Sequence, residues 1–327
     1  METDKWSPKI DLSSSLDTAS LKGKTVLITG GATGIGQGCA IALAEAGAYV
    51  TIADINETDG NDTAGQLTDQ GLHAQFIKTD VTSWPSLIAA FKASLAFSPN
   101  HTLDILIPSA GVGNSGQRSW IQNPPLDANG DPEPPSTRVL DINMMAVYNT
   151  VYLALHHFRH NPGPSSDAKT ILLVASMGGF TSMTGVLDYC GSKWGVRGIF
   201  RALRGARRIL GEGHPDLRVN LLAPTFVKTN MTKGYWEYME KAGLSLAEVS
   251  DCVDVAMRLC ADEGVHGRAV AVAANGKSFD LQDDSEGLDA GTELKLAITE
   301  NRFGYVKPEK PPPAPTAAVP ANGETVA

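Results

Sequence analysis

A strand, a glycine loop and a helix follow one another near the start of the chain. Lys24–Thr29 is a short apolar run, and the glycine-rich segment Gly30–Gly36 follows it directly. Gln37–Ala46 is rich in Ala and Leu and ends at Gly47, as a helix does. Glycines in such a turn let the backbone approach a diphosphate, whose charge faces the free N–H groups of the helix start. The segment therefore favours a nucleotide-binding α/β fold, although turns also use glycine for backbone reasons alone.

Further apolar runs alternate with helical segments along the chain. We expect strands at 49–53, 74–78, 103–107, 171–175, 217–221 and 269–273, and helices at 84–97, 139–160 and 245–260. With the first run this makes seven strands. A chain of 327 residues is long enough for one large α/β domain, which we place at residues 21–306.

Several segments stand outside this alternation. Residues 1–20 are polar and Ser-rich and are expected to form a flexible arm, and the Pro/Ala-rich residues 307–327 a disordered tail. Residues 113–138 carry many Pro, Gly and Asn residues and are longer than a usual connection. Two interpretations stay open for them: part of a substrate lid, or a surface insertion. Residues 225–245 are expected to form a substrate loop.

The net charge limits the kinds of binding partner, and the cysteines indicate the redox compartment. A formal charge of −9 argues against nucleic acid or an anionic membrane surface as the main partner. The four cysteines form no paired CxxC pattern, so we expect free thiols in a reducing compartment, without a metal site. No secretory signal or membrane span is apparent, and a cytoplasmic location is the expectation.

Asp54 follows the second expected strand, Tyr49–Ala53. An acidic side chain in this place accepts hydrogen bonds from the adenosine ribose hydroxyls of a dinucleotide. The same carboxylate would repel a 2′-phosphate, and no Arg or Lys lies between Gly30 and Asp54 to neutralise one. We therefore expect NAD rather than NADP as the cofactor. The alternative is a solvated acid that begins a turn with Asn56.

Tyr189 and Lys193 are four residues apart, which on a helix puts both side chains on one face, a turn from each other. A free tyrosine titrates at about pH 10, and a nearby ammonium favours the phenolate by lowering the pKa. Ser176 ends the apolar run Ile171–Ala175, so its hydroxyl should emerge where open α/β sheets bind ligands. Tyr189 is therefore a candidate proton-transfer group, although this spacing also arises by chance.

The helix after Lys193 carries four arginines on one face: Arg197, Arg201, Arg204 and Arg208. This is either a charged stripe for a subunit contact or an acidic substrate, or simply a solvated face. Both interpretations stay open.

Several short motifs occur together in one order. They are Thr29–Gly36, Asp80–Val81, Ala110–Gly111, Asn143, Ser176, Tyr189–Lys193 and Asn220–Pro224. In this combination the chain, over about residues 21–275, resembles the short-chain dehydrogenase/reductase family. The glycine loop with Asp54 is similar to the NAD-dependent hydroxyprostaglandin dehydrogenase-like branch and to tailoring dehydrogenases of microbial secondary metabolism. The resemblance implies a single doubly wound Rossmann-fold domain with a seven-stranded parallel sheet.

The resemblance also implies a role for each matching residue. Tyr189 would exchange a proton with the substrate oxygen, and Ser176 would orient that oxygen. Lys193 would hold the nicotinamide ribose and depress the pKa of the phenol, and Asn143 would keep a water in line with Lys193. The implied cofactor contacts, besides Asp54, Tyr189 and Lys193, are Gly30, Gly34, Ile35, Gly36, Asp80, Val81, Ala110, Gly111, Val227 and Thr229. Family members are mostly dimers or tetramers joined through the helices that contain Asn143 and Tyr189, so we expect a homodimer or homotetramer.

The chain departs from the family pattern at three places. Ser109 stands where an Asn is usual, and Pro108 before it lacks a backbone donor. Thr225 stands where a glycine commonly follows Pro224, and Gly191 loosens the helix between Tyr189 and Lys193. None of the three removes a reacting group.

The sequence thus predicts an NAD-dependent oxidoreductase that moves a hydride to or from a secondary alcohol or ketone, with Tyr189 as general acid/base. An apolar small-molecule substrate is inferred from side chains expected near the pocket, unless they are core or subunit contacts: Met177, Met183, Leu187, Phe226, Tyr235, Trp236 and Met239. Two other functions stay open. One is an NADH- or NADPH-dependent ketoreductase of a biosynthetic pathway, and the other is a dinucleotide-binding regulator or scaffold with idle catalytic groups.

Overall fold

The computed structural model describes residues 6–113, 123–163, 167–181, 183 and 185–283. The expected disordered tail, residues 307–327, lies outside the described residues. Within them no helix is long and apolar enough to cross a membrane.

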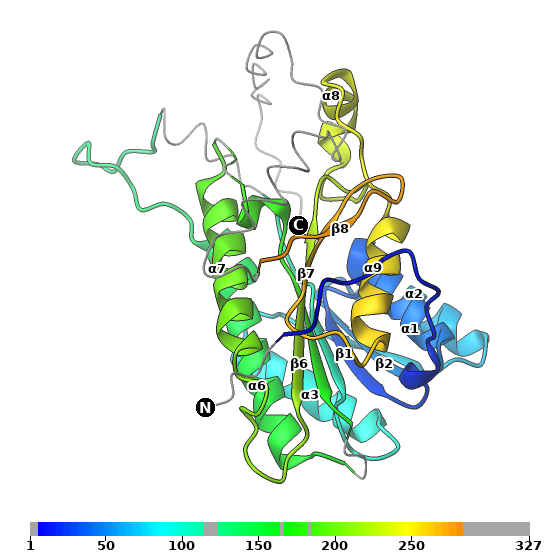
Figure 1. The fold of residues 1–327 in the computed structure, drawn as a ribbon. Helices are drawn as coiled ribbons and strands as arrows, with labels where there is room; N and C mark the ends of the chain where they lie inside the picture. Colours follow the sequence, from blue (N-terminus) through cyan, green and yellow to red (C-terminus); the bar gives the residue numbers. More distant parts are fainter. Residues whose placement is uncertain (1–5, 114–122, 164–166, 182, 184, 284–327) are drawn as a thin grey trace.

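One eight-stranded sheet forms the middle of the molecule, in the order β3-β2-β1-β4-β5-β6-β7-β8 (Figure 1). The strands are Thr25–Thr29 (β1), Tyr49–Asp54 (β2), Ala74–Lys78 (β3), Ile105–Pro108 (β4), Lys169–Val174 (β5), Leu217–Pro224 (β6), Ala269–Val272 (β7) and Phe279–Asp280 (β8). From β3 to β7 all neighbours pair in parallel. The doubly wound parallel sheet is confirmed, with its switch point between β1 and β4.

The strand count is eight rather than the predicted seven. After β7 the chain reverses through Asn275 and Gly276, which both have positive φ, and β8 returns antiparallel to β7. An Asn-Gly pair adopts these left-handed angles readily and is a strong signal of such a reversal. The Asn-Gly pair therefore marks this reversal in the sequence. The strand prediction used only apolar runs and so did not include β8.

Helices cover both faces of the sheet (Figure 1). Their bounds are Gly34–Glu45 (α1), Glu57–Asp69 (α2), Trp84–Phe97 (α3), Arg138–Leu140 (α5), Ala146–His160 (α6), Leu187–Arg204 (α7), Trp236–Lys241 (α8) and Val249–Ala261 (α9). One core cluster joins the sheet to α1, α2 and α9, and a second joins it to α3, α6 and α7. This is the three-layer arrangement that a parallel sheet needs to bury both faces.

The helix expected from Val139 to about His160 is interrupted. A π-helical turn over Asp141–Met145 separates α5 from α6, and the N–H of Ala146 donates to the carbonyl of Asp141 five residues back. Such a turn accommodates one extra residue and often occurs at functional sites. Asn143 lies inside it.

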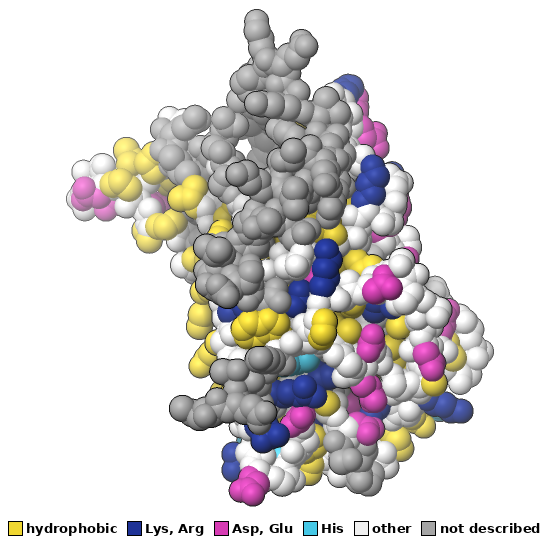
Figure 2. Space-filling model, viewed as in Figure 1, with side chains coloured by type: hydrophobic (Ala, Val, Ile, Leu, Met, Phe, Trp, Pro, Cys, Tyr) yellow, Lys and Arg dark blue, Asp and Glu magenta, His cyan; other side chains and the backbone are white. Residues whose placement is uncertain are grey.

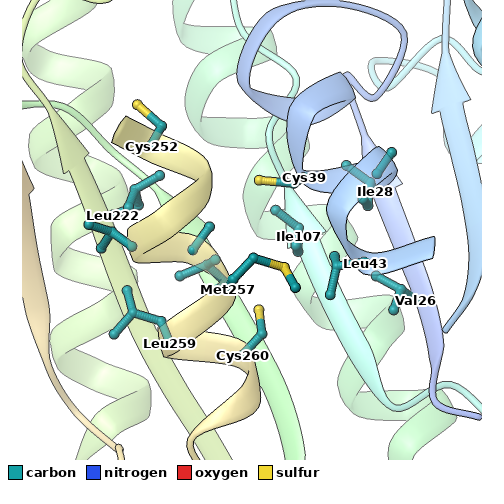
Figure 3. Packing of buried hydrophobic residues seen from close by; sticks show 14 of the residues in the cluster. Val26, Ile28, Cys39, Leu43, Ile107, Leu222, Cys252, Met257, Leu259 and Cys260 are labelled. Carbon is teal, nitrogen blue, oxygen red and sulfur yellow. The ribbon is translucent and has the colours of Figure 1, made fainter. Parts of the chain in front are cut away.

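Helices α1 and α9 pack closely through small and apolar residues (Figure 3). A Cβ on Gly38 of α1 would lie only 2.7 Å from a methyl group of Val253 on α9. Cys39, Cys252 and Cys260 are buried in this layer as free thiols, as predicted. Burial raises the pKa of Cys252 and of Cys260 to about 12, so these thiols stay protonated at neutral pH.

The N-terminal segment is not the loose arm that its composition predicts, at least from residue 6 onward. Ser7 exchanges hydrogen bonds with His266, and the N–H of Ile10 donates to Asp280 on β8 over 3.0 Å. Ile10 is buried, and the guanidinium carbon of Arg204 lies 4.6 Å from the ring centroid of Trp6. Contacts with the residues just before β7, with β8 and with α7 hold the segment, and a polar composition gives no sign of them.

The arginine stripe on α7 is only partly solvated. Arg197 is buried, pairs with Asp283 through two nitrogens, and stacks on Phe180 at 4.2 Å. Arg204 is buried between Trp6 and Phe200. Both expected interpretations are therefore wrong for these two arginines. Arg208 is exposed, but α7 ends at Arg204, so Arg208 does not lie on the helix as predicted.

The described part of the long insertion, residues 123–137, projects from the fold as an exposed segment (Figure 1). Leu126 and Pro132 form an antiparallel bridge, and the Asp127 carboxylate accepts the N–H groups of Asn129 and Asp131 at 2.8 and 3.0 Å. In Figure 2 it stands clear of the body and carries hydrophobic side chains. Residues 123–134 line neither cavity described below, which favours a surface insertion over a lid for this part.

Candidate active site

A cavity of about 490 Å³ opens at the C-terminal ends of the parallel strands. Its walls come from the segments that follow β1 to β6, and α1, α5 and α7 also contribute. The predicted residues in its lining are Gly30, Gly34, Ile35, Gly36, Asp54, Asp80, Val81, Ala110, Gly111, Ser176, Tyr189, Lys193, Val227 and Thr229. Of the predicted site residues, Asn143 alone is outside this lining. Strand order brings together groups that are up to about 200 residues apart, at the place where doubly wound sheets bind ligands.

The glycine loop packs too closely against neighbouring backbone to accept side chains at Gly30 and Gly36. Gly30 and Gly34 have φ values of 68° and 59°, which favour glycine. A Cβ on Gly30 would lie 2.5 Å from the Cα of Ala110, and one on Gly36 would lie 2.0 Å from the carbonyl oxygen of Gly30. The loop therefore packs tightly against its neighbours and leads into the N-terminus of α1, as binding of a diphosphate requires.

Asp54 stands at the end of β2 with its carboxylate held in place. Its Oδ2 accepts the N–H of Ala32 at 3.0 Å, and its Oδ1 accepts the N–H of Asn56 at 2.9 Å. Each carboxylate oxygen can accept a further bond, so the side chain can still receive ribose hydroxyls. Asp54 also begins the turn with Asn56. The turn and the acceptance of ribose hydroxyls are therefore compatible in the same side-chain position.

Ser176, Tyr189 and Lys193 meet within this cavity. Ser176 follows β5, accepts the N–H of Gly178 at 3.1 Å, donates its hydroxyl to the carbonyl of Pro224 over 3.4 Å, and lies close enough to Tyr189 to lower the pKa of the phenol. Lys193 Nζ lies 5.8 Å from the ring centroid of Tyr189 and donates to the carbonyl of Val174 over 3.2 Å. The two side chains share one face of α7, as their spacing predicts.

Comparison with known proteins agrees with this geometry. A family model described as short chain dehydrogenase matches residues 24–240, which is more than half of the 327 residues. The chain belongs to the short-chain dehydrogenase family. This dehydrogenase-family member is 38% identical over 305 residues to a 5′-hydroxyaverantin dehydrogenase of Dothistroma septosporum, covering 89% of this chain and 97% of the relative. A 5′-hydroxyaverantin dehydrogenase of Emericella nidulans is 36% identical, with 88% and 95% covered.

Another relative and one solved structure extend the picture. An NADP-dependent dehydrogenase of a Phoma species is 33% identical, covering 91% of this chain and 89% of the relative. A 3-ketoacyl-(acyl-carrier-protein) reductase of Brucella melitensis, solved with NADH, has a TM-score of 0.65 and 26% identity, covering 79% of this chain and 99% of the other. The chain is therefore an oxidoreductase of this family in a secondary-metabolism branch, and it shares the family's dinucleotide-binding fold.

Burial is the main cause of the pKa shifts of Tyr189 and Lys193 in this family member. Burial raises the pKa of the Tyr189 phenol above its usual value, against a smaller lowering by the hydrogen bond from Ser176. Burial also lowers the pKa of Lys193 to about 8. The expected lowering of the phenol pKa by Lys193 is therefore not seen in the protein on its own. At 5.8 Å from the ring centroid, the ammonium does not offset the desolvation of both groups.

Asn143 lies beside the cavity, where it holds one of the cavity walls. Its Oδ1 accepts the N–H of Val112 at 2.8 Å, and its Nδ2 donates to the carbonyl of Val112 at 2.9 Å and to Ser192 Oγ at 3.3 Å. Val112 itself lines the cavity. The buried amide thus fixes the segment after β4.

The segment after β4 keeps its place despite its unusual residues. The N–H of Ser109 donates to the carbonyl of Thr29 over 3.0 Å, and Pro108 pairs with Thr29 in the β1–β4 ladder. The departure from Asn to Ser therefore leaves the backbone in register with β1. Ser109 also lines the cavity.

The expected apolar substrate residues divide into several groups. Met177 and Met239 are buried, so they are core residues rather than pocket residues. Leu187 and Tyr235 are exposed and outside the cavity lining, and Trp236 donates its indole N–H to Thr232 over 2.9 Å. Met183 lies close to Tyr189, because a Cβ on Gly178 would lie 3.2 Å from the Met183 sulfur and 3.3 Å from the Tyr189 ring.

Sequence reasoning missed several residues of the cavity wall. They are Arg138, Ile142, Val112, Gly113, Asn230, Met231 and Thr232. A Cβ on Gly113 would lie 3.3 Å from Met231 Cγ, so the segments after β4 and β6 meet across the cavity mouth. No local pattern marks such residues, because their role depends on contacts between distant segments.

Proposed function

We propose that this oxidoreductase transfers a hydride between NAD and the oxygen-bearing carbon of a secondary alcohol or ketone. The observation that carries the proposal is the meeting of Ser176, Tyr189 and Lys193 in the cavity that also contains the glycine loop and Asp54. A regulator or scaffold has no need of this arrangement of reacting groups.

The side chains fit a proton transfer at one oxygen. Ser176 and Tyr189 both line the cavity, and Ser176 is close enough to lower the pKa of the phenol, so a substrate oxygen placed between the two hydroxyls would contact both. Ser176 would orient that oxygen, and Tyr189 would take up its proton during oxidation or return it during reduction. The glycine loop and Asp54 would hold NAD, whose nicotinamide supplies the hydride acceptor when bound. The Lys193 ammonium would contact the nicotinamide ribose, and a water held by Asn143 beside Lys193 stays a prediction.

Asp54 is the basis for NAD. Its carboxylate, fixed by Ala32 and Asn56, would accept ribose hydroxyls and repel a 2′-phosphate. The names of relatives point both ways, since one is called NADP-dependent and the solved reductase contains NADH. Because the names of the relatives disagree, the proposal of NAD rests on the Asp54 carboxylate. The remaining cofactor contacts are proposed at the predicted glycines, Asp80, Val81, Ala110, Gly111, Val227 and Thr229, all of which line the cavity.

The substrate is proposed to be a mostly apolar, moderately bulky alcohol. Val112 and Met231 line the cavity, and Met183 lies next to Tyr189. Two relatives covered over nearly their whole lengths are named 5′-hydroxyaverantin dehydrogenase, which favours oxidation of an alcohol of a secondary metabolite. Reduction of a ketone would use the same groups in reverse, and the likeness to a 3-ketoacyl reductase favours it as the second candidate.

We also propose a homodimer or homotetramer in the cytoplasm. Tyr148 and Tyr152 on α6 are 54% and 59% exposed, and Trp194 on α7 is 41% exposed. Large exposed aromatics on two neighbouring helices suit a contact with a second copy.

The proposal is tested with purified protein, NAD or NADP, and a panel of secondary alcohols of increasing apolar size. We expect turnover with NAD, and a fall of about 100- to 10,000-fold in kcat for Tyr189→Phe with NADH binding retained by calorimetry. A clear preference for NADP contradicts the Asp54 argument. An unchanged rate in Tyr189→Phe contradicts the catalytic role, and an unchanged cellular role without turnover would favour a regulator.

A further inference from the structure

The adenosine end of the cavity has an exposed apolar side chain on one wall. Ile55 follows Asp54 directly at the end of β2, lines the cavity, and is 65% exposed. A single exposed isoleucine is ordinary on a protein surface. This one borders the residues proposed to hold adenosine, Asp54 and Asp80, so an apolar ligand face could cover it.

A different element supplies a cation to the same cavity. Arg138 begins α5, Ile142 follows one turn later, and both line the cavity. Arg138 is exposed, and among the described residues its guanidinium has no ion pair or hydrogen bond. Two acids lie near it, and each accepts a hydroxyl of its own segment: Asp141, three residues on, accepts the Thr137 hydroxyl at 2.7 Å, and Asp80, in the same cavity lining, accepts the Thr82 hydroxyl at 2.7 Å. Arg138 and Lys193 are the Arg and Lys residues among the described residues that line the cavity.

A second cavity, of about 780 Å³, adjoins the first at this end. The two cavities share Ile55, Asp80, Arg138 and Ile142, so these four residues form a common rim. A flat base lying at this rim would have β2 and its Ile55 on one side, and α5 with Arg138 on the other.

We propose that Arg138 stacks its guanidinium on the adenine of the bound dinucleotide and holds it against Ile55. A guanidinium is planar, weakly hydrated and well suited to stacking on an aromatic face, whereas an ammonium is not. This inference rests on the proposed function, because it assumes that an adenine dinucleotide binds in the cavity. It makes Arg138 a positioning residue for the cofactor.

The placement of Arg138 also gives the long insertion a role. Residues 123–137 end immediately before it, and the N–H of Arg138 donates to Ser136 Oγ over 3.3 Å. The Thr137 hydroxyl binds Asp141 in the following π turn. The last residues of the insertion thus anchor the start of α5 and with it the proposed adenine contact.

The test measures calorimetric binding of ADP-ribose, which contains the adenosine diphosphate part but cannot turn over. Arg138→Ala should weaken ADP-ribose binding by about 3- to 30-fold. Arg138→Lys should recover only a minor part of this loss, because it keeps the charge and loses the planar group. Arg208→Ala removes an exposed arginine outside the cavity and is the matched control, with binding unchanged. Circular dichroism melting confirms that each variant is folded.

Each other outcome overturns a definite part of the reasoning. If wild type binds ADP-ribose and Arg138→Ala binds it equally well, the adenine contact is wrong and the proposed function stands. Full recovery in Arg138→Lys, or loss of the effect at 0.5 M salt, indicates charge attraction instead of stacking. A much larger loss with 2′-phospho-ADP-ribose than with ADP-ribose assigns Arg138 to a 2′-phosphate. If wild type binds neither ligand, the proposed function fails together with this inference.

Discussion

Replacing Lys193 by methionine should stabilise the fold at neutral pH while it removes activity. Lys193 is only 7% exposed, and burial lowers the pKa of its ammonium from 10.5 to about 8. From these two pKa values, keeping the proton on the buried group costs about 3 kcal/mol at pH 7. Methionine has a similar length and no charge, and it gives up the hydrogen bond to Val174, worth about 1 kcal/mol. The net gain in the free energy of unfolding is therefore about 2 kcal/mol.

The gain should depend on pH in a definite direction. Because the pKa of Lys193 is lower in the folded state, the unfolded chain binds more protons between about pH 8 and 10.5. Wild-type stability from this group is therefore present above pH 10.5 and is lost as the pH falls through about 8. The advantage of Lys193→Met should be largest below about pH 7.5 and should shrink to about 0.5 kcal/mol by pH 9.5.

Urea denaturation of the cofactor-free protein at several pH values measures this difference. Lys92→Met on α3 is the control, since Lys92 is exposed and its removal should change stability little at any pH. A Lys193→Met variant that is no more stable than wild type at pH 7, or whose advantage does not change with pH, would refute the buried-charge reasoning. Lost activity with gained stability would identify Lys193 as a residue kept for function at the expense of stability.

Two further substitutions test the cofactor site. Asp54→Asn keeps an acceptor for the N–H of Ala32 but removes the negative charge. The preference in kcat/KM for NAD over NADP should therefore fall at least about tenfold, or about 1.4 kcal/mol. An unchanged preference in steady-state kinetics would exclude Asp54 as the determinant of cofactor choice. Gly36→Ala would place a Cβ 2.0 Å from the Gly30 carbonyl oxygen, so calorimetry should show NADH binding weakened by more than about tenfold, or about 1.4 kcal/mol. Gly65→Ala on α2, with nothing within 4 Å of its Cβ position, is the matched control and should bind NADH like wild type.

The regular elements could be predicted closely because their signals are local. The strand Ala74–Lys78 and the helix Trp84–Phe97 lie where the apolar periodicity places them, and Tyr189 and Lys193 share one face of α7. The short β8 and the π turn at Asp141–Met145 were missed. The first is a two-residue strand that follows an Asn-Gly turn, and the second differs from an α-helix by a single inserted residue.

The surroundings of individual side chains were predicted less completely, because they depend on burial and on contacts between distant segments. Polar composition suggested a loose start of the chain, yet Ile10 is buried and bonded to Asp280. Arg197 occupies a helical stripe in the sequence, but its surroundings include Asp283, 86 residues away, and the sequence gives no sign of that pairing.

The sequence by itself determined the order of strands and helices, the glycine loop, and the helical pairing of Tyr189 with Lys193. These depend on neighbours within about one or two turns of the chain, where periodicity and glycine placement act directly. Only the tertiary structure decided that burial raises the pKa of Tyr189, that Asn143 holds Val112, and that Arg138 and Met231 line the cavity. Desolvation and wall contacts arise when segments far apart in the sequence pack together, and no local pattern records that packing.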